Sequence, residues 1–402
     1  MNFSLLLPDM PVRRGGHCPQ LDFALLSAVA VLFSLGLVMV TSASMPVADR
    51  LELGTFYFAE RQGIYLLMGL ALGLLVLRVR MAWWERGSQL CILLAILLLA
   101  LVLVPGIGVE VNGSTRWMNF GFLRLQVSEP AKLLALIYMA GYLVRHGESV
   151  RYTRIGFAKP LLLLLVVSVL LLMEPDFGAT VVLMATALVM MFIAGVSLWK
   201  FGALIALAGA GFAALAISSP YRLERLTTFL NPWADPFNSG FQLTQSLIAI
   251  GRGEWLGVGL GASIQKLFYL PEAHTDFLFA VLAEELGLLG ILVLLGLYAF
   301  LVLRAYVIAN AAEHDGNLFS AYLAYGVGTW LGLQAFINIG VNTGLLPTKG
   351  LTLPLMSYGG SSMLVTCVAI AMLLRIDYET RCSVNSMPAS GTQPARRRRS
   401  VA

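Results

Sequence analysis

The sequence is short of charge. Of its 402 residues, only 12% are Asp, Glu, Lys or Arg, whereas 58% are hydrophobic. A soluble domain carries about 25% charged residues. The composition therefore excludes an ordinary soluble enzyme and predicts a chain that crosses a membrane several times.

The motifs of several large enzyme classes are also missing. The sequence has no Walker loop, no dinucleotide-binding fingerprint, no Gly-x-Ser-x-Gly and no Cys nucleophile in a His setting. His274 and Asp276 make at most two metal ligands, so no metal site is predicted. The four cysteines form no pair within an external loop, which argues against a disulfide framework.

Ten apolar runs approach the roughly 20 residues that a spanning helix needs. Most Lys and Arg residues lie in connections on the side of the N-terminus, so the positive-inside rule places both termini in the cytoplasm. We therefore predict an all-α, polytopic membrane protein with ten transmembrane helices. The runs lie at about 22–43, 62–79, 87–106, 130–144, 160–174, 178–195, 198–218, 278–303, 319–339 and 354–375.

This topology divides the chain into three parts. Residues 1–21 form a cytoplasmic segment, residues 22–376 the transmembrane domain, and residues 377–402 a basic tail predicted to be disordered. A large external loop at about 219–277 joins helices seven and eight. An amphipathic helix is expected in it from Pro236 to Gly251, and its aromatic residues suit the headgroup layer of the membrane.

The loop between the third and fourth spans contains a turn signal, Asn112-Gly113. After it, Ser128 and Pro130 indicate the start of a helix, which places Glu129 and Lys132 three residues apart on one face. This pair either anchors the helix end or lines a polar cavity.

The loop between the ninth and tenth spans is rich in glycine and proline. It reads Gly340-Val341-Asn342-Thr343-Gly344-Leu345-Leu346-Pro347-Thr348-Lys349-Gly350 and leads to Ser357. Such irregular backbone is tolerated at membrane depth only against protein or a wet cavity. The backbone N–H groups from Gly359 to Ser362 could cradle an anion at a helix start, or the small residues could simply permit close helix packing.

Acidic residues gather where the large loop becomes the eighth span. Pro271 suits the first position of a helix and Glu272 its first turn, which is ordinary capping chemistry. Asp276 lies at the mouth of the apolar run and is not explained in that way. It is either structural or a catalytic or binding group, and we expect the second. The Glu174-Pro175-Asp176 corner adds two more carboxylates.

Together these segments resemble the SEDS family of cell-wall polymerases, named for shape, elongation, division and sporulation. The resemblance covers about residues 22–376, and the end of the first span favours the division branch over the elongation branch. In this chain Val127 and Glu174 stand where the family commonly has proline and glutamine. The matching residues are Asn112-Gly113, Arg116-Trp117, Ser128-Glu129, Lys132, Glu174-Pro175-Asp176, Gly178, Gly240-Phe241-Gln242, Gln245-Ser246, Gln265-Lys266, Leu270-Pro271-Glu272, His274-Thr275-Asp276-Phe277 and Ser357-Tyr358-Gly359-Gly360-Ser361-Ser362.

The resemblance implies a peptidoglycan glycosyltransferase that polymerises lipid II into β-1,4 glycan strands at the outer face of the bacterial inner membrane, at the division septum. For this reaction we expect Asp276 to be the catalytic base, because it lies at the external mouth of the eighth span beside the long amphipathic loop. A divalent cation stays open as a cofactor. The alternatives are a lipid II flippase, an elongation-type polymerase and a structural scaffold. The expected substrate-binding residues are Arg116, Glu129, Lys132, Lys266, His274, Lys349, Ser357 and Ser361.

Partners follow from the same resemblance. Besides lipid II and membrane lipids, we expect other division proteins and a class B penicillin-binding protein, an FtsI-like transpeptidase, and no nucleic acid. Small residues on the eighth and ninth spans would let a partner helix approach closely. The candidates for that surface are Gly287, Gly290, Gly296, Gly326, Gly328 and Gly332.

Overall fold

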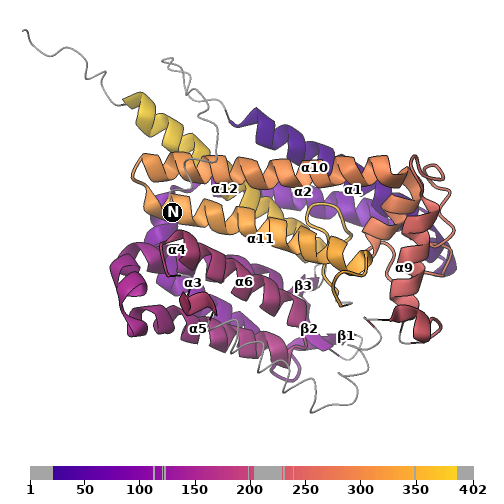
Figure 1. Cartoon of the computed structure of the whole chain (residues 1–402), viewed down its shortest axis with the longest axis horizontal. Helices are drawn as coiled ribbons and strands as arrows, with labels where there is room; N and C mark the ends of the chain where they lie inside the picture. The colour runs from indigo at the N-terminus through magenta and orange to yellow at the C-terminus, as the bar shows by residue number, and fades with distance from the viewer. Residues whose placement is uncertain are drawn as a thin grey trace, which may run out of the picture.

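The structure, a computed structural model, is mostly helical, and its longest helices run side by side (Figure 1). It describes residues 21–111, 114–119, 121, 124–197, 199–202, 229, 231–238, 240–347 and 350–386. The helices are α1 (Phe23–Arg50), α2 (Tyr57–Arg78), α3 (Met81–Val102), α4 (Ser128–Tyr152), α5 (Arg154–Met173), α6 (Phe177–Ile193), η2 (Pro232–Ala234), α9 (Phe241–Arg252), α10 (Leu278–His314), α11 (Leu318–Asn342) and α12 (Gly360–Ser386).

Nine of the ten predicted spans fall on these helices, and the seventh, at 198–218, lies almost wholly outside the described residues. Among the described helices, α1, α2, α3, α5, α10 and α12 are long and apolar enough to cross a membrane, and α6 is a shorter apolar helix. These helices agree with a multi-pass membrane protein.

The prediction of an all-α chain missed a small sheet. Strands β1 (Gly108–Val111), β2 (Ser114–Asn119) and β3 (Arg124–Gln126) form an antiparallel sheet in the order β1-β2-β3. Val111 pairs with Ser114 across the Asn-Gly turn signal, whose own residues lie outside the described part. The sheet lies at the same end of the bundle as α9 (Figure 1).

Helices α4 and α11 lie in the interior of the bundle. Residues 319–331 of α11 are all buried, and α4 is buried over most of Ser128–Leu143. The polar side chains of both helices, such as Lys132 and Gln334, are therefore shielded from lipid by the surrounding helices, as charged residues in a membrane require.

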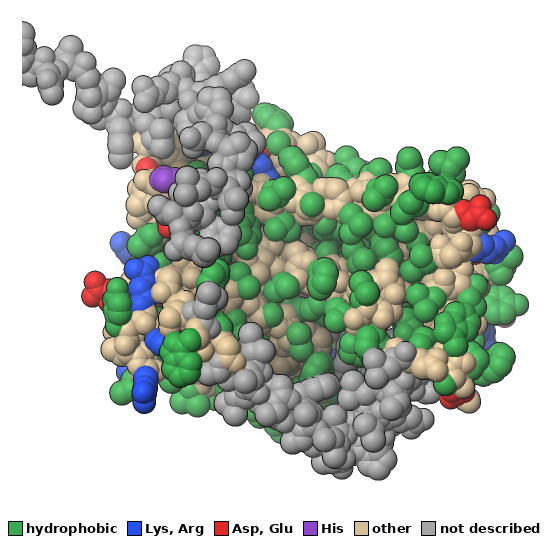
Figure 2. Space-filling model, viewed as in Figure 1, with side chains coloured by type: hydrophobic (Ala, Val, Ile, Leu, Met, Phe, Trp, Pro, Cys, Tyr) green, Lys and Arg blue, Asp and Glu red, His purple; other side chains and the backbone are tan. Residues whose placement is uncertain are grey.

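The outer surface shows the complementary pattern. In Figure 2, hydrophobic side chains cover the middle of the visible face, while Lys, Arg, Asp and Glu lie towards its two ends. The exposed apolar residues include Leu74, Leu94, Leu165 and Leu292, which lie on four different helices. This belt is the surface that a lipid bilayer would cover.

The start and the end of the described chain meet at the end of the bundle opposite the sheet. Asp22, the N-cap of α1, pairs with Arg304 of α10 at 2.5 Å and lies 4.0 Å from Arg381 of α12. Helix α12 continues ten residues past the boundary expected at 376, because its last turns are held by contacts of this kind. The tail from residue 387 lies outside the described residues.

Helix α10 is broken at Gly287, where φ is 64° and ψ is −162°. The segment that follows α9 packs into the break and forms hydrogen bonds with the backbone groups of α10 on both sides of it. The four hydrogen bonds run from Val258 N to Glu284 O (3.0 Å), from Gly259 N to Glu285 O (3.1 Å), from Leu288 N to Glu254 O (2.9 Å) and from Leu289 N to Trp255 O (3.1 Å). The segment after α9 and the helix α10 are thereby joined into one unit.

The close contact between this segment and the break predicts a strong glycine requirement at position 287. A Cβ there would lie 2.3 Å from the backbone N of Gly257, and only glycine adopts this backbone conformation readily. Gly287→Ala should destabilise the protein by about 1–3 kcal/mol, seen as a lower thermal unfolding midpoint in detergent. Gly296→Ala lies on the same helix in open space and is the matched control. Equal unfolding midpoints for the two variants would contradict the prediction that position 287 requires glycine.

Candidate active site

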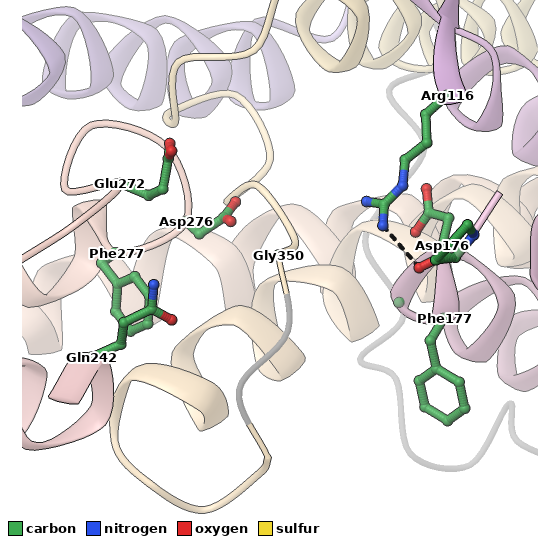
Figure 3. A pocket seen from close by; sticks show the side chains of 10 residues that line it. Arg116, Asp176, Phe177, Gln242, Glu272, Asp276, Phe277 and Gly350 are labelled. Carbon is green, nitrogen blue, oxygen red and sulfur yellow. Dashed lines mark hydrogen bonds between the residues drawn. The ribbon is translucent and has the colours of Figure 1, made fainter. Parts of the chain in front are cut away.

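A cavity of about 220 Å³ lies at the end of the bundle that carries the sheet. Segments far apart in the sequence meet around it (Figure 3). Its lining residues are Arg116, Pro175, Asp176, Phe177, Gly178, Gln242, Glu272, Asp276, Phe277 and Gly350.

One wall is acidic. Glu272 and Asp276 both come from the turn that precedes α10, and in Figure 3 the Asp276 carboxyl points across the cavity. The expectation that a helix begins at Pro271 is wrong: α10 begins at Leu278, and Glu272 adopts a left-handed conformation with φ 54°. Because Glu272 is not in a first helical turn, capping no longer accounts for its charge.

The opposite wall is formed by Arg116 of β2 and the corner between α5 and α6. Arg116 donates from Nε to the Glu174 carbonyl (2.7 Å) and from Nη2 to the Pro175 carbonyl (2.8 Å). Asp176 caps α6, accepting from Ala179 N at 3.1 Å. The β strands, absent from the prediction, therefore bring a cation to face the carboxylates.

Burial gives the Asp276 carboxyl its particular chemistry. It raises the pKa of Asp276 from 3.8 to about 7; the nearby charges of Glu272 and Asp176 add to the rise, and Arg116 opposes it. A carboxylate with a pKa near 7 is matched to general base catalysis at neutral pH. A guanidinium facing it is matched to a phosphate or another anion.

Glu129 and Lys132 form the ion pair that their spacing predicts. Lys132 Nζ lies 2.8 Å from Glu129 Oε1 and donates to Gln334 Oε1 at 3.1 Å, and it lies 5.3 Å from the centre of the Trp330 ring. Both charged side chains are buried, and neither lines the cavity. The pair connects α4 to α11 at the core of the bundle.

Lys266 is also engaged inside the protein. Its Nζ lies 2.8 Å from Glu285 Oε1 and 2.8 Å from Ser42 Oγ, and it is only 6% exposed. The adjacent Glu284 pairs with Arg252 at 2.9 Å. These two ion pairs fasten the end of α9 and the loop after it to α10, and none of their residues lines the cavity.

His274 packs against the rings of Phe58 and Tyr358, at centroid distances of 4.8 and 5.7 Å. Burial lowers the pKa of its imidazole, and the charge of Glu272 opposes this shift. It does not line the cavity, although Asp276 of the same turn does.

Ser357 and Ser361 also take structural contacts. The hydroxyl of Ser357 accepts from Leu353 N at 3.0 Å, and that of Ser361 accepts from Gln126 N at 2.8 Å. Gly360, in the suggested anion cradle, packs against the ring of Tyr65, and Lys349 lies outside the described residues.

Three polar residues that line the cavity were missing from the predicted site: Asp176, Glu272 and Gln242. Each belongs to a segment that carried the family resemblance, so the signal was present, but only the fold shows that the three segments converge. No group of three His, Cys, Asp or Glu side chains among the described residues is placed to hold a metal ion.

The fold and the cavity define a class: a multi-pass membrane protein with a carboxylate and a guanidinium facing each other at one end of its bundle. Residues 23–382 match the model of the cell cycle protein family that groups FtsW, RodA and SpoVE, and the chain belongs to this family.

Individual relatives also match the chain over most of its length. The chain is 62% identical over 361 residues to a probable peptidoglycan glycosyltransferase FtsW of Thioalkalivibrio sulfidiphilus, which covers 90% of both chains. It is 55% identical over 360 residues to the Legionella pneumophila protein of the same name, covering 90% of this chain and 91% of that one.

Two solved structures are similar. One belongs to work on the structural coordination of polymerization and crosslinking by a peptidoglycan synthase complex; its TM-score is 0.74 at 31% identity, covering 90% of this chain and 98% of that one. The rod shape determining protein RodA of Thermus thermophilus has a TM-score of 0.65 at 30% identity, covering 89% and 96%.

The Glu174 side chain generates a pH prediction. It is fully buried, and neither carboxyl oxygen has a hydrogen-bond partner among the described residues. Burial, and secondly Asp176, raise its pKa from 4.5 to about 8. The folded state therefore holds a proton that the unfolded state releases, and stability should fall as the pH rises from about 4.5 to 8.

Glu174→Gln should remove this loss, because a neutral amide of the same shape carries no proton to release. We expect its thermal unfolding midpoint to exceed that of the wild type at pH 9 and to differ little at pH 5. Glu148→Gln, at an exposed position, should leave both midpoints unchanged. A Glu174→Gln variant with the wild-type pH dependence would contradict the buried neutral carboxyl.

The Glu129–Lys132 ion pair predicts that the stability losses caused by substituting its two residues are not additive. Lys132→Met leaves a buried carboxylate without its cation and should cost about 3–5 kcal/mol of stability. Adding Glu129→Gln removes that charge and should recover part of the loss. A double-mutant cycle of thermal stabilities measures the coupling, and additive losses would show that the two side chains do not act as a pair.

Proposed function

We propose that this chain is a peptidoglycan glycosyltransferase that polymerises lipid II into β-1,4 glycan strands. One observation carries the proposal: the Asp276 carboxyl, with its raised pKa, faces Arg116 across a cavity at one end of the bundle. The high identity to proteins named peptidoglycan glycosyltransferase supports it.

The reaction assigns a task to each wall of the cavity. Asp276 accepts the proton of the acceptor sugar's hydroxyl as that oxygen attacks the anomeric carbon of the donor. The bond from this carbon to the lipid pyrophosphate breaks, and the pyrophosphate leaves with the electron pair. Arg116 stabilises the charge of the leaving group, since a guanidinium binds phosphate oxygens well.

The proposed reaction also sets the orientation of the protein in the membrane. We place the cavity at the outer face of the bacterial inner membrane, with ten spans and both termini in the cytoplasm. A lipid-linked substrate can then keep its chain in the outer leaflet while its sugars enter the cavity. Ion-paired charges of the described part, among them Asp22, Arg304 and Arg381, lie at the opposite, cytoplasmic end.

A lipid II flippase needs a polar path from one side to the other. The buried carboxylates of the described chain instead form one group near the cavity end and another near the opposite end. Glu129 and Glu285 of the first group are each paired with a lysine. This distribution favours polymerisation at one surface over transport.

The division branch is supported by the relatives. The matches at 62% and 55% identity carry the name FtsW, whereas the RodA structure is 30% identical. We therefore place the protein at the division septum rather than in an elongation complex.

The remaining predicted substrate-binding residues have supporting roles in this proposal. Among the described ones, Lys132, Lys266 and Ser361 each bind another part of the protein and do not line the cavity. We assign them, with Glu129, His274 and Ser357, to holding the walls in place, and we assign direct contact with the pyrophosphate to Arg116.

A class B penicillin-binding protein remains the proposed partner, supported by the complex of polymerization and crosslinking that this chain resembles. The glycine surface expected for it is wrong in part. A Cβ at Gly326 would meet Met190 of α6, and Cβ atoms at Gly328 and Gly332 would meet Ala305 and Val302 of α10, so these glycines pack within the chain. Gly287 likewise packs within the chain, against Gly257, whereas Gly296 of α10 lies in open space and stays a candidate contact for a partner helix.

Substitution of Asp276 tests the function. Asp276→Ala removes the base, and purified protein should polymerise labelled lipid II at least ~100-fold more slowly than the wild type, with an unchanged thermal unfolding midpoint. In the wild type the rate should rise with pH through about 7, because only the ionised carboxylate accepts a proton.

Glu272→Gln is the matched variant in the same turn. Since the charge of Glu272 raises the pKa of Asp276, its removal should move the acid limb of the rate profile to lower pH while activity persists. Polymerisation by Asp276→Ala at the wild-type rate would refute the assignment.

A further inference from the structure

Helix α11 carries three carboxamide side chains at successive turns: Gln334, Asn338 and Asn342. They are 1%, 2% and 0% exposed, so each sits in the interior of a membrane protein. A buried amide without hydrogen bonds is destabilising, and the partners of these amides therefore show what they hold in place.

The two asparagines converge on a single atom, the backbone carbonyl oxygen of Asp276. Asn338 Nδ2 donates to it at 2.9 Å and Asn342 Nδ2 at 3.1 Å. Two donors use both lone pairs of that oxygen. Each amide group also donates once more, Asn338 to Leu351 O at 2.5 Å and Asn342 to Asn338 O at 2.8 Å.

The attachment matters because Asp276 lies outside any helix. Within its turn, Thr275 N and Phe277 N both donate to the Glu272 carbonyl, and α10 begins only at Leu278. The Asp276 carbonyl is thus fixed from outside the turn, by α11.

Asn338 also fixes the chain that faces the carboxylate. Its bond to Leu351 O holds the residue next to Gly350, and a Cβ at position 350 would lie 2.8 Å from Asp276 Oδ2. One amide group therefore sets both the backbone that carries the carboxylate and the backbone that forms its wall. Neither asparagine lines the cavity.

We propose that Asn338 and Asn342 are positioning residues for Asp276, which clamp its backbone to α11 and so fix its carboxylate in the cavity. That the clamp serves catalysis rests on the proposed function. The hydrogen bonds that form the clamp are a property of the fold.

The first test uses the purified full-length protein. Asn338→Leu keeps a similar volume and removes both donors, so kcat for lipid II polymerisation should fall ~10- to 100-fold, because a small misplacement of a reacting group has an effect of this size. KM should stay within ~2-fold of the wild type, since neither asparagine touches the cavity. Each single variant leaves one bond to Asp276, but Asn342→Leu also keeps the bond from Asn338 to Leu351 O, so it should show a smaller fall in kcat.

Thr329→Val is the matched control on the same helix. Its buried hydroxyl donates to Tyr325 O at 2.7 Å and pairs with the Tyr306 hydroxyl at 2.8 Å, remote from the cavity residues. It should lower the thermal unfolding midpoint and leave kcat unchanged. A general loss of α11 packing would instead lower kcat in all three variants.

The second test needs no turnover. A water-soluble carbodiimide labels protonated carboxyl groups, and the labelling of Asp276 is followed by mass spectrometry across pH. The wild-type midpoint should lie near pH 7. Asn338→Leu should move it lower, because a released carboxyl becomes better hydrated.

The outcomes separate the two ideas. An Asp276→Ala variant that polymerises lipid II at the wild-type rate would end the proposed catalytic role of Asp276, and the labelling midpoint of Asn338→Leu would still decide the clamp. Wild-type kcat together with a wild-type midpoint in Asn338→Leu would overturn the clamp, and so would a loss confined to KM. If Asn338→Leu does not fold, Asn342→Leu decides in the same way.

Discussion

Polar groups inside this bundle must be satisfied by other parts of the protein, because hydrocarbon offers no hydrogen bonds. That constraint organises the cavity end of the molecule. Lys132 donates hydrogen bonds to Glu129 and Gln334, and Lys266 donates hydrogen bonds to Glu285 and Ser42. The bonds from Lys132 to Gln334 and from Lys266 to Ser42 join segments distant in sequence, so these scarce charges connect helices to one another.

The spans and the ion pair at Glu129 and Lys132 could be predicted from the sequence because both depend on local rules. Apolar run length identifies a spanning helix, and an i,i+3 spacing places two side chains on one helical face. The amphipathic helix expected at Pro236–Gly251 is present as α9, at Phe241–Arg252. The choice of Asp276 likewise came from its position next to an apolar run.

The rest of the site depends on non-local contacts. Arg116 faces Asp276 because a three-stranded sheet carries it there, and sheet pairing between short strands leaves little trace in one sequence. Lys266 has the charge of a phosphate ligand, yet its position beside Glu285 is set by the loop that folds back on α10. Residue type alone does not separate a cation that binds substrate from one that holds a loop.

The break in α10 has a mechanical consequence. A glycine in a membrane helix is commonly a place where two halves can swing. Here, any swing at Gly287 would first separate four backbone hydrogen bonds to residues 254–259. Such a swing would leave the carbonyl groups of Glu284 and Glu285, both fully buried residues, without these partners. The break therefore resists bending, and a displacement of residues 254–259 is passed to the short helical piece that follows Asp276, so that this segment and the helix move as one body.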